Sequence, residues 1–492
     1  MMEIPIVHPS RVVHPWLQKT RFVIKPGPTT PLLEEVLTGL REQFQQQGHV
    51  LLNMPQDEVD IWITTAAFNQ PVNWREAPMF SAKRMFRLAY HPTVFTLVQM
   101  SRKQFTTLLD HFEIAAAKEE PDPADYHFPG LASNAYLTLH EQGSRAGAIL
   151  SLIRLIQSQT MSVRVILIIG EKQIEEAYTF DLVGAHPRTV YEENGEWFYE
   201  DLVLRMVTAA STREVTQHEV VGKPIPQAIW QSLSTPVAMR RAGKELGRRK
   251  FFTRMVEVGN LVNIPLFNHA IASQYSEGCF ATWDASLDAL ITTITGSARP
   301  VDKDNLSDNE LAVIVAMRAD GLGACVRHVE GKRNDPPSSE AVELIGMDSR
   351  LPRIRLGQEG KLQKEVPVAR SKLHGHRGIK SFDPELVEHV YLDPPYYHFP
   401  VSCSTEAQAV GIMSAFARSE ALRNPDDARQ LVFTVLPGHG VVIVEKWVAG
   451  KTPFQLIWEA MDNGWLEIDS HIPQGMFKYV ADKTGRMRLV EQ

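Results

Sequence analysis

The stretch Leu290-Ile-Thr-Thr-Ile-Thr-Gly-Ser297 opens the part of the sequence that is most informative about fold and function. Its apolar and β-branched residues predict a strand over 289–293, and the run Leu311-Ala-Val-Ile-Val315 predicts another over 311–317. Small hydroxyl residues and glycine follow these strands, notably in Pro337-Ser-Ser-Glu340. Backbone N–H groups of such segments can surround an anion. The sequence therefore predicts strands accompanied by segments that can bind an anionic ligand.

Three histidines further along the chain form a candidate metal site. His374 and His376 are one residue apart, so on an extended segment both side chains point to the same side and can reach one ion. His439 stands between two glycines and can complete a three-ligand site with a position open for substrate. Such nitrogen ligands suit Zn²⁺ best, and other divalent transition metals are the alternative. Glu340 is the candidate acid/base, with helix capping as its alternative role.

Several pieces of the C-terminal half, taken in order, resemble the class II (zinc-dependent) aldolase and adducin family. They are Gly247-Arg-Arg-Lys-Phe-Phe252, Glu277-Gly-Cys-Phe-Ala-Thr-Trp283, Ile291-Thr-Thr-Ile-Thr-Gly296, Pro337-Ser-Ser-Glu340, His374-Gly-His376 and Leu436-Pro-Gly-His-Gly-Val-Val-Ile443. The separation of His376 and His439 along the chain is also similar to that between the family's paired and third histidines. The common order of the pieces carries the resemblance.

The length of 492 residues predicts at least two domains, because a single hydrophobic core rarely grows to this size. We expect an α/β protein in which residues 1–225 form an α/β domain of unrecognised type with an irregular, proline-dotted N-terminal arm. Residues 226–492 would form a second domain, with the boundary in Gly222-Lys-Pro-Ile-Pro226. The resemblance implies three layers for this second domain, with a mixed or mostly antiparallel central sheet between helices.

Local patterns predict the elements of both domains. Thr30 is the expected N-cap of a helix over 31–47, and Ser101 with Gln104 forms a capping box. Strands are expected over 59–65, 93–98, 163–170, 431–436 and 441–445, with 163–170 buried on both faces. Further helices are expected over 146–159, 236–262, 405–421 and 453–461, and residues 351–372 form a charged insertion relative to the family.

The resemblance implies a metal-dependent carbon–carbon lyase-type enzyme that acts through an enediolate on a small anionic carbonyl substrate. Aldol cleavage, epimerisation and decarboxylation share this intermediate, and the sequence does not choose among them. Zn²⁺, or another divalent transition metal, would polarise the carbonyl, and Glu340 would move the proton. The alternative is a non-catalytic, adducin-like scaffold or binding protein that has lost the metal.

The resemblance also implies an anion-binding set. Thr295, Gly296, Ser338 and Ser339 match the family's threonine-glycine pair and serine pair, which hold the anionic group of the substrate. The family has an asparagine where this chain has Cys279, whose thiol is a weak donor. Arg299 and Arg333 could supply bidentate contacts in its place, which leaves a carboxylate substrate open beside a phosphate.

Two further assignments depend on the resemblance. A competing register places Asp393 where the family has its paired histidines, but it shortens the distance along the chain to His439, and we prefer His374 and His376. The family is a homo-oligomer in which a tyrosine enters the site from a neighbouring subunit as an acid. Tyr479 is the nearest positional candidate, and a homo-oligomer is expected here too.

Composition limits the classes of function. A net charge of −7 argues against a general nucleic-acid binder, so the basic segment Arg240 to Arg254 is interpreted as a solvated helix face. Three cysteines are too few for a disulfide framework and indicate reduced thiols and a cytoplasmic protein. No apolar run approaches the length that crosses a membrane, and no signal peptide is visible. We therefore expect neither a nucleic-acid partner nor a membrane partner.

Overall fold

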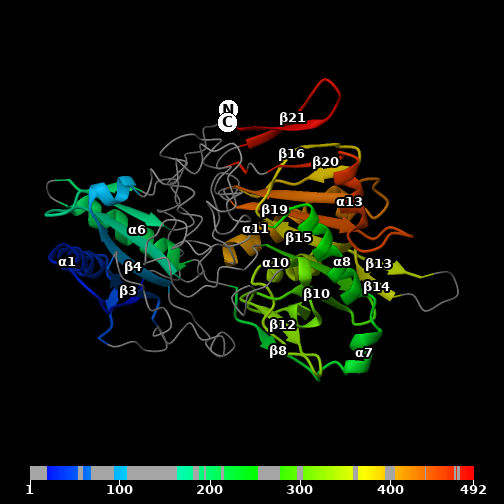
Figure 1. The fold of residues 1–492 in the computed structure, drawn as a ribbon, viewed down its shortest axis with the longest axis horizontal. Coiled ribbons are helices and arrows are strands. Elements are labelled where there is room, and N and C mark those ends of the chain that lie inside the picture. Colours follow the sequence, from blue (N-terminus) through cyan, green and yellow to red (C-terminus); the bar gives the residue numbers. More distant parts are fainter. Residues whose placement is uncertain are drawn as a thin grey trace. The chain divides into compact units, whose positions relative to one another are not determined.

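The computed structural model describes a mixed α/β protein with several sheets (Figure 1). It describes residues 19–53, 59–67, 93–107, 163–180, 188–192, 195–211, 215–252, 278–295, 303–357, 364–393, 405–437, 439–469, 472–473 and 477–491. These residues divide into two compact units, the first ending at Ser211 and the second beginning at Val215. Each unit is described by itself below.

The first unit is built on a mainly parallel sheet. In the described residues the strands follow the order β2-β1-β3-β4-β5-β6-β7. The strands β1 to β5 pair in parallel, and β6 and β7 continue the sheet antiparallel. Their bounds are β1 Arg21–Ile24, β2 Val50–Leu51, β3 Ile61–Ala66, β4 Thr93–Met100, β5 Val163–Ile169, β6 Glu176–Phe180 and β7 Arg188–Val190. The helices α1 (Pro31–Gln46) and α6 (Glu196–Ser211) share one hydrophobic core with this sheet.

Local sequence signals explain these elements. The Thr30 side chain accepts a hydrogen bond from the backbone N–H of Leu33, which confirms the predicted start of α1. The capping box is also confirmed, since Ser101 N–H donates to Gln104 Oε1 over 2.8 Å and Gln104 N–H donates to Ser101 Oγ over 3.2 Å. Residues Ile166 to Ile169 of β5 are fully buried, as expected for a central strand. The helix predicted over 146–159 lies outside the described residues.

The second unit is built on a nine-stranded sheet in its described part, of order β17-β18-β19-β15-β9-β10-β11-β12-β8. Neighbouring strands pair antiparallel except for the two outermost pairs, β17 with β18 and β12 with β8. The bounds are β8 Glu219–Val220, β9 Cys279–Asp284, β10 Ala289–Thr293, β11 Leu311–Met317, β12 Ala324–Arg327, β15 Ala369–Gly375, β17 Val387–His389, β18 Leu431–Leu436 and β19 Gly440–Lys446. Strands β10 and β11 have the bounds that the sequence predicts.

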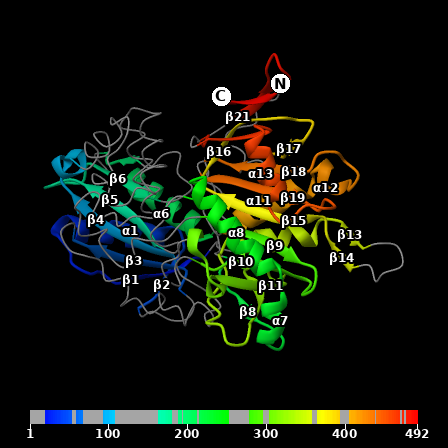
Figure 2. The same ribbon diagram turned by 45° about the vertical axis from the view of Figure 1, so that its right-hand side comes forward.

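Helices cover both faces of this sheet (Figures 1 and 2). The helices α8 (Thr235–Arg248) and α13 (Gln455–Asp462) pack on one face, and α10 (Ala341–Gly346), α11 (Glu406–Ala417) and α12 (Glu420–Arg423) pack on the other. Alternation along the strands serves both cores: Val441 and Ile443 of β19 face the first pair of helices, and Val442 and Val444 face the other three. The short helix α7 (Gln227–Ser232) precedes α8.

A smaller sheet of order β20-β16-β22-β21 adjoins the first of these cores. Its strands are β16 Gly378–Phe382, β20 Leu466–Asp469, β21 Phe477–Ala481 and β22 Met487–Glu491.

In the described part of the chain, no helix combines the length and apolar character needed to cross a membrane. Cys279 and Cys325 are free thiols.

Three predicted elements differ from the structure. The helix expected over 236–262 ends at Arg248, because Lys250 adopts a left-handed conformation with φ of 50°. The helix expected over 405–421 is broken into α11 and α12, because the Ser419 hydroxyl caps a new helix by accepting from Leu422 N–H. The insertion expected over 351–372 contains a hairpin of β13 (Arg353–Leu356) and β14 (Lys364–Pro367), followed by the start of β15.

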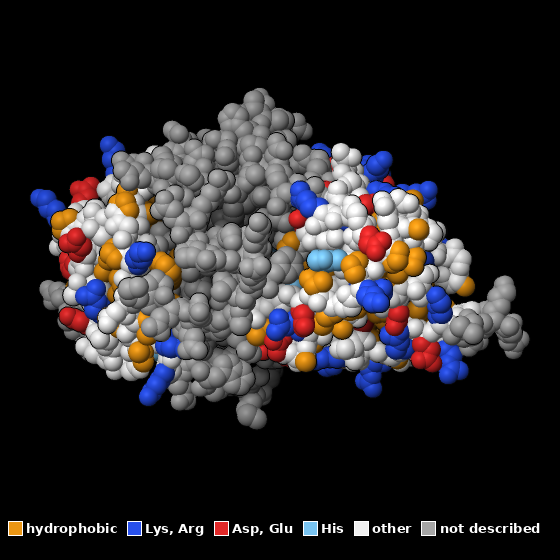
Figure 3. Space-filling model, turned by 90° about the horizontal axis from the view of Figure 1, so that it is seen from below, with side chains coloured by type: hydrophobic (Ala, Val, Ile, Leu, Met, Phe, Trp, Pro, Cys, Tyr) orange, Lys and Arg blue, Asp and Glu red, His pale blue; other side chains and the backbone are white. Residues whose placement is uncertain are grey.

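Several basic residues in α8 and directly after it are paired with acidic neighbours. Arg240 contacts Asp308, and Arg249 contacts both Glu245 and Asp462. On the face of the second unit seen in Figure 3, cationic and anionic side chains are interspersed over the described residues. Charges of both signs that are mixed in this way are typical of a solvated surface.

A buried histidine should make the stability of the second unit depend on pH. The Nδ1 atom of His218 accepts a hydrogen bond from Ala324 N–H over 3.2 Å, and burial, with Arg318 nearby, lowers the pKa of His218 to about 4. The unfolded chain binds this proton near pH 6.5, so the free energy of unfolding should fall as the pH drops from about 6.5 to about 4. The largest loss from this residue is about 3 kcal/mol.

Urea unfolding of wild type and His218→Asn between pH 4 and 8 measures this contribution. The variant should be less stable at pH 8, and the difference between the two proteins should shrink toward pH 4. Equal pH slopes for both proteins would show that His218 does not carry the effect.

Candidate metal centre

Two neighbouring strands of the nine-stranded sheet bring the three histidines together. His374 is the penultimate residue of β15, where it pairs with Val442 of β19, and His376 follows the end of β15. His439 lies in the turn that joins β18 to β19. A Cβ atom on Gly440 would lie 2.2 Å from the carbonyl oxygen of Gly375. Glycine at 440 therefore allows the two histidine-bearing segments to touch.

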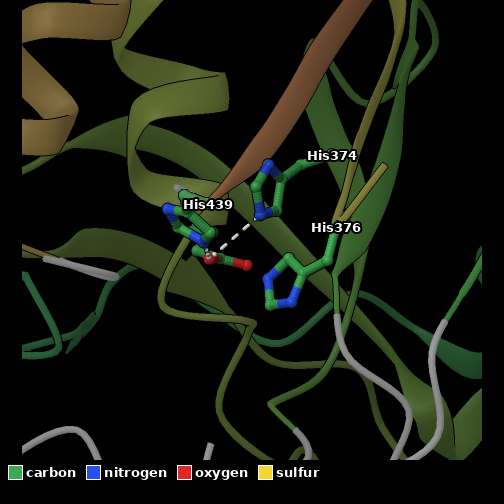
Figure 4. Close-up of side chains that lie close together, drawn as sticks. His374, His376 and His439 are labelled. Atoms are coloured by element: carbon green, nitrogen blue, oxygen red, sulfur yellow. Dashed lines mark ion pairs between the residues drawn. The ribbon is translucent and has the colours of Figure 1, made fainter. Parts of the chain in front are cut away.

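The three imidazoles face one another (Figure 4). Their ring centroids are 5.0 Å apart for His374 and His439, 4.9 Å for His376 and His439, and 5.6 Å for His374 and His376. His374 and His439 are buried, and His376 is half-buried. One ligand atom from each histidine and one from Glu340 all lie within 4.8 Å of one another. These four side chains could bind a metal ion.

Glu340 reaches this group from a segment that is attached to the end of β10. An isolated bridge pairs Ile294, just after β10, with Pro337, and Ser338 N–H donates to the carbonyl of Thr293 over 3.0 Å. These bonds hold the Pro-Ser-Ser segment against the sheet, and Glu340 follows it as the N-cap residue of α10. The side chain of Glu340 makes no capping hydrogen bond. It therefore does not cap the helix, which was the alternative role considered from the sequence.

The contacts of Glu340 are with two imidazoles. Its Oε1 lies 3.1 Å from His374 Nε2 and 3.3 Å from His439 Nε2. Burial opposes ionisation, but the contacts with His374 and His439 hold the pKa of Glu340 well below its usual value. Burial lowers the pKa of His439 to about 4, so this imidazole is uncharged at neutral pH. The site therefore combines a carboxylate with an uncharged imidazole, as metal ligands require.

A hydrogen bond fixes the orientation of His374. Its Nδ1 lies 3.1 Å from the carbonyl oxygen of Val441, and since a carbonyl only accepts, Nδ1 carries the proton. A neutral His374 then presents the lone pair of Nε2 toward Glu340 Oε1. Two acceptors at 3.1 Å repel unless a proton or a cation lies between them. His439 Nε2 lies 3.3 Å from the same oxygen, so the carboxylate and the imidazole nitrogens converge as the ligands of a cation do.

Most of the predicted anion-binding residues gather next to Glu340. Thr295, Ser338 and Ser339 are buried, and Thr295 N–H donates to the carbonyl of Pro336 over 2.9 Å. Cys279 lies directly across from His374 in the pairing of β9 with β15, and its thiol interacts with the side chain of Ser338. Burial raises the pKa of Cys279 well above its usual value, which keeps it a neutral thiol.

Of the two arginines predicted to bind the anion, only Arg333 lies among the described residues. Arg333 donates to Asp335 over 2.5 Å on an exposed turn. Gly296 and Arg299 lie outside the described residues. Asp393, the alternative ligand, is an exposed residue that pairs with Arg418 over 2.8 Å and is not among the four clustered side chains.

Tyr479 is not among the four clustered side chains. It belongs to β21, is buried among aromatic rings, and its hydroxyl donates to the carbonyl of Ile379 over 2.7 Å. Burial raises the pKa of Tyr479 well above its usual value. To act as an acid in a neighbouring subunit, this hydroxyl would have to leave its contact with Ile379.

Sequence reasoning missed two buried ionisable residues on the segments that carry the cluster. Glu343 follows Glu340 on α10, and neither of its carboxylate oxygens has a hydrogen-bond partner among the described residues. Lys372 precedes His374 by two residues on β15 and is fully buried. The period of two along a strand could have revealed Lys372, because it places Lys372 on the same face as His374.

Comparisons with known proteins found no relative of this chain. Neither the known protein families, nor the curated proteins, nor the solved structures contain a match to the chain.

Proposed function

We propose that the second unit is a metal-dependent enzyme that makes or breaks a bond next to a carbonyl group, with chemistry of the class II aldolase type. The observation that supports this most directly is the convergence of His374, His376, His439 and Glu340. The proposed reaction proceeds through an enediolate, and the proposed substrate is a small carbonyl compound that carries an anionic group.

The proposed roles follow from the positions of the residues. His374, His376 and His439 would hold Zn²⁺ or another divalent transition metal. Such an ion would supply Lewis acidity that polarises a carbonyl oxygen. Glu340 would take a proton from the carbon next to the carbonyl and return it, and a cation beside it would favour its base form at neutral pH.

The surroundings of Glu340 support an anionic substrate. The buried residues Thr295, Ser338 and Ser339 would bind the anionic group through their hydroxyl groups, because the backbone N–H groups of Thr295 and Ser338 already donate to carbonyls of the chain. A central sheet that is mostly antiparallel, with helices on both faces, supports the three-layer arrangement implied by the family resemblance.

Metal content and proton exchange test the proposal together. Protein purified without chelator should carry close to one zinc-like ion per chain by elemental analysis. In deuterated water it should exchange the proton next to the carbonyl of an α-hydroxycarbonyl compound, observed by NMR with probes bearing phosphate, carboxylate or neither. The anionic probes should exchange fastest, and chelation of the metal should stop the exchange.

Each negative result has a distinct meaning. Protein without any transition metal, even after incubation with zinc, would contradict the enzyme and favour the non-catalytic scaffold. Protein that binds zinc but exchanges no probe would contradict the proposed carbonyl chemistry and leave a metal-binding unit.

A further inference from the structure

An ion pair between Lys372 and Asp348 lies in the interior of the second unit. The side chain of Lys372 has no exposed area, and that of Asp348 is only 5% exposed. The Lys372 ammonium contacts Asp348 Oδ2 and donates a second hydrogen bond to the carbonyl of Leu344 over 2.6 Å. One buried cation therefore joins two acceptors from a neighbouring segment.

The two segments are those that carry the candidate metal ligands. Lys372 stands two residues before His374 on β15, so both side chains leave the same face of the strand. Leu344 lies within α10, the helix that Glu340 precedes, and Asp348 follows this helix. The ammonium of Lys372 thus connects the strand that carries His374 to the helix that carries Glu340.

Stability does not account for this pair. Two charges that leave water lose hydration, and apolar residues of similar volume in place of a buried ion pair are often neutral or stabilising. The surroundings are apolar: Leu344, Ile345 and Met347 belong to the same hydrophobic core. The second oxygen of Asp348, Oδ1, has no hydrogen-bond partner among the described residues. An apolar pair would therefore suit this core at least as well.

We propose that Lys372 and Asp348 are positioning residues that set the register of α10 on β15 and thereby hold Glu340 against His374. The proposal rests on the proposed function of this site. Apolar contacts tolerate sliding of a helix on a sheet, whereas the bonds of Lys372 to Leu344 and Asp348 are directional. The 3.1 Å distance between Glu340 Oε1 and His374 Nε2 is the quantity that these bonds control.

The double variant Lys372→Met/Asp348→Leu distinguishes an effect on the position of Glu340 from an effect on the stability of the protein. Its metal-free form should unfold at the same temperature as wild type or higher. Its cobalt(II) spectrum should change toward that of Glu340→Gln, and its zinc affinity, measured by chelator competition, should fall roughly 10–100-fold, as for loss of an outer-shell partner. If the double variant does not fold, Lys372→Met serves instead, since Asp348 can become neutral by protonation.

Ser371→Ala is the matched control. Ser371 adjoins Lys372 but leaves the other face of β15, where its hydroxyl donates to Glu445 over 2.8 Å. This variant should leave the cobalt spectrum and zinc affinity unchanged.

Several results would overturn the proposal. They are a double variant with the wild-type spectrum and affinity, a loss of affinity that only accompanies a lower unfolding temperature, and a Glu340→Gln variant with the wild-type spectrum. The last would mean that Glu340 does not lie at the ion. Wild-type protein that binds neither cobalt nor zinc would instead refute the proposed function itself.

Discussion

His439→Ala should lose tight zinc binding while the metal-free protein keeps its fold. His439 supplies one of three imidazoles, so its removal should weaken zinc binding by more than the roughly 10–100-fold typical of outer-shell changes. Glu340 Oε1, which lies 3.3 Å from His439 Nε2, keeps its contact with His374 in this variant, so we expect the fold to persist. Elemental analysis and chelator competition measure the loss, and circular dichroism of the metal-free protein checks the fold.

His389 offers a matched control within the same unit. It is enclosed by the aromatic rings of Tyr391, Phe433 and Tyr479, and its Nε2 lacks a hydrogen-bond partner among the described residues. His389→Ala should lower the unfolding temperature by removing packing, yet leave zinc affinity unchanged. Equal zinc affinity in wild type and His439→Ala would remove His439 from the site and with it the proposed three-histidine centre.

Local sequence patterns predicted those parts of the fold that depend on local chemistry. Strands β10 and β11 have their predicted bounds because their apolar, β-branched runs end at turn residues. Thr30 caps α1 because its hydroxyl reaches a backbone N–H three residues on. The spacing of His374 and His376 predicted one shared side, and the structure places both beside His439.

Features fixed by contacts between distant segments were beyond local patterns. The break between α11 and α12 depends on Glu388, which accepts from the Ser419 hydroxyl over 2.6 Å and from Glu420 N–H over 3.0 Å. No local sequence pattern near Ser419 predicts its contact with the carboxylate of Glu388. The role of Lys372 likewise depends on Asp348, which lies in a different element. In both cases a charged residue from elsewhere in the chain decides where a helix begins or sits.

Glu340→Gln should keep the metal and lose proton transfer. Glutamine has the shape of glutamate but cannot accept a proton at neutral pH, so loss of the positioned base should slow exchange of the proton next to the carbonyl by ~10²–10⁴-fold. The three histidines remain, so zinc should still bind.

Glu343→Gln is the control that makes this result specific. Glu343 is fully buried on the adjoining turn of α10, and burial together with the charge of Glu340 raises the pKa of Glu343 well above its usual value. Its favoured form is therefore the uncharged acid, which glutamine mimics, so its replacement should change the exchange rate little. Equal slowing by both substitutions would mean that any change on α10 disturbs the site. An unchanged rate in Glu340→Gln would show that Glu340 does not move the proton, whatever its contact with His374 and His439.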